Sequence, residues 1–96
     1  MQARVSTYQF PSSNIDDAIE QFTNALGTVE EPGLERAELL VDRASGKALT
    51  ITVWQSEEAL QSSVEAANRI RRGAADSAGV QIVDVSHYEI IEPGAS

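Results

Sequence analysis

The order of strand-like and helix-like segments is the feature that most constrains the fold of this 96-residue chain. Apolar residues recur with a period of two in some segments and with a helical period in others, and each period predicts one kind of secondary structure. The segments follow the order strand, helix, strand, strand, helix, strand. Strands are predicted over residues 3–10, 34–41, 48–54 and about 80–91. The helices are predicted to begin after the Ser12-Ser13-Asn14 cluster and after Ser56.

Both helices are predicted from apolar stripes and from residues that favour helix starts. In the first helix, apolar residues at steps of four, three and four share one face. They are Ile15, Ile19, Phe22 and Leu26. Ser56 is a favourable N-cap for the second helix. The apolar stripe of that helix consists of Leu60, Val64, Ala67, Ile70, Ala74 and Ala78.

These segments predict an α+β fold of the ferredoxin-like type, βαββαβ, with a four-stranded antiparallel sheet and two helices on one face. Residues 42–47 form a cluster of turn-favouring residues between two strand-like runs, which indicates a β-hairpin. No linker or low-complexity tract divides the chain. We therefore expect residues 1–96 to form a single domain.

Alternation of side chains along the strands predicts two different sheet faces. One face is aliphatic, and we expect it to lie under the helices. It gathers Val5, Ala37, Leu39, Val41, Leu49, Ile51 and Val53, with Val83 and Val85. The other face mixes aromatic, hydroxyl and charged side chains. It gathers Arg4, Ser6, Tyr8, Phe10, Arg36, Glu38, Leu40, Thr50, Thr52, Trp54, Ile82, Ser86, Tyr88 and Ile90.

The mixed face predicts that the chain pairs with a second copy. Left open, Trp54, Tyr8 and Tyr88 would contribute to a larger apolar patch than monomers usually expose. A second sheet packed face to face would bury this patch, so we expect a homodimeric α+β barrel that encloses lined pockets. The alternative is a solvated face, as in many antiparallel sheets. A β-bulge in the last strand would exchange Tyr88 for His87 on the mixed face.

Charge and composition exclude several classes of function. Seven basic and fifteen acidic residues leave a net charge of −8, which repels nucleic acid and anionic membranes. With no cysteine and one histidine, we expect no metal site, and no glycine-rich phosphate-binding motif indicates another cofactor. No apolar run is long enough for a membrane span or a signal peptide. We expect a cytoplasmic location.

Three segments carry a resemblance to a known family. They are Val5-Ser6-Thr7-Tyr8-Gln9-Phe10-Pro11, Trp54-Gln55-Ser56-Glu57-Glu58-Ala59-Leu60 and Tyr88-Glu89-Ile90. With the element order, they resemble the antibiotic biosynthesis monooxygenase-like (ABM) domains. The resemblance implies a dimeric α+β barrel and, in some members, oxygenation of aromatic substrates without metal or flavin. A haem-degrading branch has an Asn on the first strand and a His on the second helix. Ser6 stands at the first position here and the helix has no His, so haem degradation is disfavoured.

The candidate site residues come from the mixed face and from the last strand. The candidate substrate-binding residues are Trp54, Tyr8, Tyr88, Ser6 and Thr52. His87 and Arg36 are the candidate catalytic residues, for proton transfer and for stabilising negative charge. Each has a structural alternative: the aromatic rings could pack an interface, His87 could be a structural strand residue, and Arg36 could pair with a nearby acid. Three further arginines are predicted to form a solvated helix face: Arg69, Arg71 and Arg72.

The leading function is the binding of a small aromatic or polyketide-like molecule, with cofactor-independent monooxygenation as its catalytic form. Two alternatives stay open at this point. One is a ligand-binding module without catalysis, and the other is a structural dimeric module whose mixed face closes without a cavity.

Overall fold

The computed structural model of the chain describes residues 1–27 and 31–91. The strands are β1 (Gln2–Gln9), β2 (Leu34–Val41), β3 (Lys47–Trp54) and β4 (Gln81–Glu89). The helices are α1 (Ile15–Gly27), α2 (Glu57–Ser62) and α3 (Val64–Ala78), and a 3-10 turn over Ser12–Asn14 precedes α1. Every predicted strand is present, with bounds within a few residues of those predicted.

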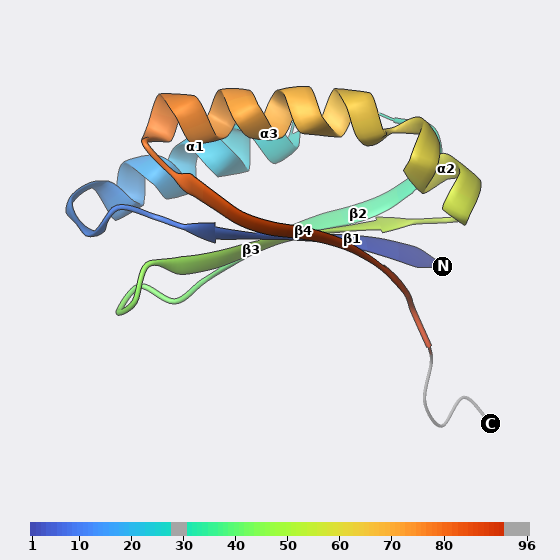
Figure 1. Ribbon diagram of the computed structural model, residues 1–96, viewed down its shortest axis with the longest axis horizontal. Coiled ribbons are helices and arrows are strands. Elements are labelled where there is room, and N and C mark those ends of the chain that lie inside the picture. Colours follow the sequence, from blue (N-terminus) through green and yellow to red (C-terminus); the bar gives the residue numbers. More distant parts are fainter. Residues whose placement is uncertain (28–30, 92–96) are drawn as a thin grey trace.

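The strands form one antiparallel sheet in the order β2-β3-β1-β4. Helices α1 and α3 pack against each other on one side of the sheet, and the opposite face is uncovered (Figure 1). This arrangement confirms the predicted α+β fold of the ferredoxin-like type. Within the described residues, no helix has both the length and the apolar character needed to cross a membrane.

The second predicted helix is two helices, which separate at Ser63. Ser56 caps α2 as predicted, because its hydroxyl accepts a hydrogen bond from the backbone N–H of Ala59. At Ser63 the backbone leaves regular helical geometry, with φ −92° and ψ −4°. The Ser63 hydroxyl donates to the Leu60 carbonyl at 2.7 Å and accepts from Arg4 Nη2 at 2.9 Å. A side chain from β1 therefore holds the junction between α2 and α3.

The prediction of which sheet face lies under the helices is wrong. The helices cover the face that bears the polar and aromatic residues of β1 and β3, hereafter the covered face. Its buried members are Arg4, Ser6, Tyr8, Ala48, Thr50, Thr52 and Trp54. The face is tolerated inside the molecule because its fully buried polar atoms are paired. Among the described residues, no buried side-chain nitrogen or oxygen lacks a hydrogen-bond partner.

The predicted phase of β2 is also wrong. Ala37, Leu39 and Val41 pair with the covered-face residues Thr52, Thr50 and Ala48, whereas Arg36, Glu38 and Leu40 pair with Val53, Ile51 and Leu49. The aliphatic residues of β2 therefore lie under the helices. The uncovered side, hereafter the open face, includes Val5, Leu40, Leu49, Ile51 and Tyr88. Leu40 and Tyr88 are 44% and 54% exposed, whereas Trp54 is buried within a single chain.

An irregularity in β4 decides which of its side chains face the helices. The register of β4 against β1 shifts between Thr7 and Tyr8. Because Arg4 pairs with His87, the imidazole lies on the covered face and the neighbouring Tyr88 lies on the open face. The assignment of Tyr88 to the same face as Tyr8 and Trp54 is therefore wrong, and the structure shows the exchange with His87 that a bulge would produce.

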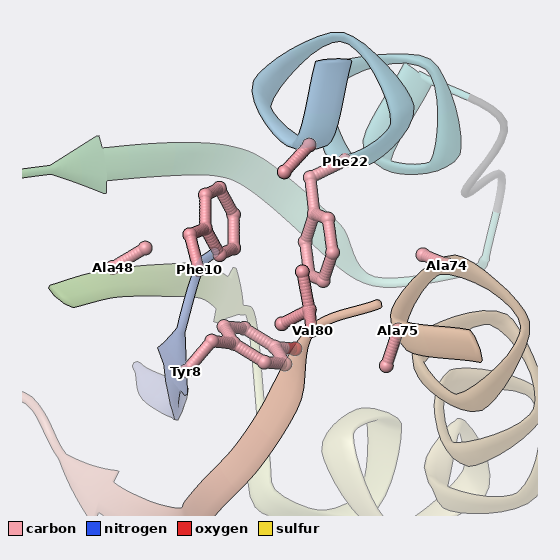
Figure 2. Close-up of a cluster of buried hydrophobic side chains, with 8 residues drawn as sticks. Tyr8, Phe10, Phe22, Ala48, Ala74, Ala75 and Val80 are labelled. Carbon is pink, nitrogen blue, oxygen red and sulfur yellow. The ribbon is translucent and has the colours of Figure 1, made fainter. Parts of the chain in front are cut away.

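The hydrophobic core lies between the covered face and helices α1 and α3. Figure 2 shows the rings of Tyr8, Phe10 and Phe22 gathered between β1 and α1. The Phe22 centroid lies 4.7 Å from that of Tyr8, edge to face, and 4.9 Å from that of Phe10. Such pairs add to the stabilisation from buried area. The cluster is completed by Ala18, Ala48, Ala74, Ala75 and Val80.

Candidate functional site

A cavity of about 60 Å³ lies between the covered face and the helices, beside the aromatic core. The two central strands contribute Arg4, Ser6, Tyr8, Thr50, Thr52 and Trp54 to its lining. The helical walls include Phe22 of α1 and, from α3, Ala66, Ala67, Ile70, Arg71 and Ala74. A volume of this size holds a few water molecules. A planar ligand of more than one ring therefore requires α3 to move away from the sheet. The alanines of α3 have short side chains, so they leave more space for such a ligand.

Hydroxyl groups on the covered face satisfy the polar ends of the aromatic rings. The Tyr8 hydroxyl lies 3.3 Å from Thr50 Oγ1, and the Trp54 indole N–H donates to Thr52 Oγ1 at 3.0 Å. Buried tyrosine and tryptophan usually need such partners. The pairs hold the rings in place and leave their apolar faces to line the cavity.

Arg4 is a buried cation in the wall of this cavity, with only 4% of its surface exposed. Its Nη2 donates to the Leu60 carbonyl at 3.1 Å and to Ser63, and its guanidinium carbon lies 5.5 Å from the Trp54 ring centroid. Burial lowers the pKa of Arg4, and the positive charge of Arg71 lowers it further. An arginine nevertheless keeps its proton in a protein, so the wall carries a fixed positive charge.

His87 extends this cluster at the sheet edge. Arg4 Nε lies 3.4 Å from His87 Nε2, a long hydrogen bond in which the imidazole accepts. Acceptance at Nε2 requires a neutral ring with its proton on Nδ1. Partial burial lowers the pKa of His87, and the charges of Arg4 and Arg71 lower it further. The imidazole is therefore neutral at neutral pH, and taking up a proton at Nε2 requires the hydrogen bond from Arg4 Nε to break.

Four of the residues predicted to bind substrate line the cavity together: Trp54, Tyr8, Ser6 and Thr52. Tyr88 and Arg36 lie on the open face, away from it. The Arg36 side chain is 65% exposed and makes a 3.8 Å ion pair with Glu38, the structural alternative considered for it. His87 contacts Arg4 and is not itself a lining residue.

Sequence reasoning missed Arg4 and Arg71 as site residues. The interpretation of Arg71 as part of a solvated helix face is wrong, because Arg71 lines the cavity, whereas Arg69 and Arg72 are exposed. A signal was present: Arg71 falls four residues after Ala67 and three before Ala74, on the apolar stripe of the helix. Arg4 shares its strand phase with Ser6 and Tyr8, but an arginine in a strand gives no sign of burial.

The cluster offers groups that stabilise negative charge and transfer protons. Within the described ranges, no three His, Cys, Asp or Glu side chains gather closely enough to hold a metal ion. The cavity combines aromatic surfaces, hydroxyl groups and the two arginines. Such a site can hold a planar molecule and stabilise negative charge on it.

Solved structures share this fold along nearly the whole chain. A candidate antibiotic biosynthesis monooxygenase from Deinococcus radiodurans is 17% identical and superposes with a TM-score of 0.74, covering 96% of this chain and 94% of its own. SnoaB, a cofactor-independent oxygenase from Streptomyces nogalater, is 13% identical with a TM-score of 0.62, covering 99% and 97%. At these identities the likeness shows the fold alone.

Sequence comparison identifies the family. No curated protein sequence matches the chain with significance. The family model described as "Antibiotic biosynthesis monooxygenase" matches residues 1–75, which includes β1, β3 and the lining residues of α1 and α3. The match agrees with the fold and with the resemblance of the Trp54 segment. The chain belongs to the antibiotic biosynthesis monooxygenase family.

Proposed function

We propose that the cavity binds a small aromatic or polyketide-like molecule and supports its oxygenation without a cofactor. The observation that carries the proposal is one cavity lined by three aromatic rings, those of Tyr8, Phe22 and Trp54, beside the buried cation of Arg4. Ligand sites are typically apolar and aromatic with a few placed polar groups. Family membership, and the likeness in fold to the cofactor-independent oxygenase SnoaB, support the catalytic half of the proposal.

In the proposed reaction, a CH₂ carbon of the substrate flanked by aromatic rings loses one hydrogen as a proton to His87. The carbanion transfers electrons to O₂ and forms a carbon–oxygen bond, giving a peroxide that takes up a proton. Loss of water removes the second hydrogen and leaves a carbonyl, so that CH₂ + O₂ becomes C=O + H₂O. The substrate supplies all four electrons, and no further reductant is needed.

Two residues take part in the chemistry of this scheme, and two others hold the substrate. The neutral imidazole of His87 accepts the proton, and the guanidinium of Arg4 stabilises the negative charge that develops on the substrate. Arg4 thereby takes the charge-stabilising role that the sequence suggested for Arg36. The rings of Tyr8 and Trp54 pack the substrate rings.

Oxygen uptake by the purified protein tests the catalytic half. With a panel of polycyclic phenols that carry a CH₂ group between two aromatic rings, we expect the wild type to consume one O₂ per carbonyl formed. Loss of a general base typically costs at least about 100-fold, so H87Q is expected to lower the rate by about that factor. The matched control Y88F changes the neighbouring open-face residue and should stay within about twofold of wild type. An H87Q variant with unchanged rate would remove His87 from the mechanism.

A second candidate function is a ligand-binding module without catalysis. It is favoured by one observation: the only histidine contacts Arg4 but is not a lining residue of the cavity. This module would bind the same aromatic compounds and consume no O₂. If the wild type binds the aromatic compounds but consumes no O₂, the protein is a ligand-binding module.

The predicted homodimer also belongs to the proposal, on a surface different from the one expected. The open face, rather than the mixed face, would meet the sheet of a second copy. Val5, Leu49 and Ile51 are only partly buried there, and Leu40 and Tyr88 are exposed. Packing two such faces together would form the α+β barrel.

A further inference from the structure

The charge balance inside the cavity is opposite to that of the whole chain. The net charge is −8, yet two arginines, Arg4 and Arg71, line the cavity and one acid, Glu31, accompanies them. Among the described residues, the ion pairs join other residues, and no carboxylate lies within ion-pair distance of Arg4 or Arg71. Buried or half-buried cations without an acidic partner are costly, so two such cations facing one cavity favour an anionic ligand there.

Each arginine has hydrogen-bonding capacity left over. Arg4 uses Nε and Nη2 for His87, Leu60 and Ser63, which leaves Nη1 without a hydrogen bond among the described residues. Since no fully buried side-chain nitrogen there lacks a partner, Nη1 reaches accessible space, and Arg4 lines the cavity. Arg71 uses Nη1 for Asn68 at 2.6 Å and keeps Nε and Nη2.

We infer that the ligand of this cavity is an aromatic carboxylate, with its oxygens held by Arg4 and Arg71 and its ring packed among Tyr8, Phe22 and Trp54. The inference rests on the proposed function and specifies its ligand. A carboxylate has two oxygens that can each accept from a different guanidinium, and arginine forms strong charge-assisted bonds to it. Because the same two cations keep His87 neutral, its imidazole adds no positive charge of its own to the carboxylate site.

The structural alternative is that both arginines serve only the fold. Arg4 does hold the α2–α3 junction through Leu60 and Ser63, so its replacement could unfold the chain and is not the test. Arg71 has only a partner on its own helix, Asn68. The test therefore uses R71Q, with R72Q as the matched control, because Arg72 is the adjacent residue, carries the same charge and is exposed.

Benzoate and benzamide are suitable probes, because they share size and shape and differ in charge. Each is titrated into ¹⁵N-labelled protein at low salt, and the indole N–H of the single tryptophan, Trp54, reports occupancy. We expect the wild type to bind benzoate at least about tenfold more tightly than benzamide. R71Q is expected to lose about tenfold for benzoate and to bind benzamide unchanged, whereas R72Q stays within about twofold for both.

Three results would overturn the inference. Equal affinity of the wild type for the two probes shows a cavity that selects the ring and not the charge, which leaves the proposed function intact. Equal losses of benzoate affinity in R71Q and R72Q show that the positive charge of the helix as a whole attracts the probe, and that Arg71 does not bind it directly. Failure of both probes to bind overturns the inference and the proposed aromatic binding together.

Discussion

Arg4 links the fold and the site through neutral partners. Its guanidinium holds the Leu60 carbonyl and the Ser63 hydroxyl and lies over the ring of Trp54. A cation over an indole contributes about 0.5–2 kcal/mol, depending on how far it is desolvated. These contacts offset part of the cost of burying the charge and leave the charge itself uncompensated. One residue thus sets both the path of the helices and the electrostatics of the cavity.

The pKa of His87 gives a prediction at the residue scale. Because partial burial and two cations lower this pKa below 6.5, the folded chain holds the imidazole neutral at pH values where the unfolded chain already binds a proton. The stabilisation from this residue is therefore fully present above about pH 6.5 and is lost as the pH falls through the folded pKa. An NMR titration of the single imidazole is expected to show a midpoint below 6.5.

The same titration separates the contributions. R71Q removes a positive charge and is expected to raise the pKa of His87, whereas R72Q should leave it unchanged, because Arg72 is not among the causes of the shift. If His87 is the base, the acidic limb of the rate profile should move upward with R71Q. An unchanged midpoint in R71Q would contradict the proximity of this cation.

At the scale of the elements, the β2–β3 hairpin depends on a glycine. Gly46 has φ +80°, its N–H donates to the Asp42 carbonyl, and its own carbonyl accepts from Phe10 N–H at 2.7 Å. A Cβ at this position would lie 2.6 Å from the Phe10 carbonyl oxygen. Both the backbone conformation and the close approach therefore exclude a larger residue.

G46A is expected to destabilise the protein by about 1–3 kcal/mol, the usual cost of a strained backbone position. G73A is the matched control, because a Cβ at Gly73 inside α3 meets nothing within 4 Å. Alanine there should stabilise by about 0.5–1 kcal/mol through helix propensity. Thermal unfolding measures both, at about 4–8 °C per kcal/mol for a domain of this size. A G46A variant as stable as wild type would mean that the turn relaxes freely.

The helices were predictable in part, for a local reason. The stripe from Ile15 to Leu26 and the cap at Ser56 involve residues close together in the chain, so periodicity reveals them. The break at Ser63 depends on Arg4, which is 59 residues away. The spacing of Arg71 from Ala67 and Ala74 indicated that it faces the sheet, whereas its charge favoured a position in solvent. Long-range contacts decide such cases.

At the scale of the whole molecule, the cavity and the proposed dimer are independent. One chain already covers Trp54 and encloses the cavity, because the helices lie on the polar and aromatic face. The open face is what a partner would cover. The cavity is lined by residues of one chain and needs no second copy to line it.

Sedimentation at micromolar concentration tests the dimer. We expect the wild type to sediment with twice the mass of one chain, and L40R to sediment as a single chain, because it places a charge on the open face that the second copy would bury. T23R is the control, since Thr23 is an exposed residue of α1 on the helical side. A wild type that sediments as one chain would refute the dimer and leave the cavity unaffected.

Local sequence patterns were enough to predict the element order and the ferredoxin-like topology, because hydrophobic periods and turn residues act over a few positions, and the resemblance of three segments pointed to the family. The sequence also brought Trp54, Tyr8, Ser6 and Thr52 into one strand phase. Which face the helices cover, and which residues of β2 and β4 lie on that face, became clear only in the folded chain. Alternation separates the side chains of a strand into two faces but does not tell which face is buried. That choice depends on strand register, on one bulge, and on whether buried polar groups such as Arg4 find hydrogen-bond partners far along the chain.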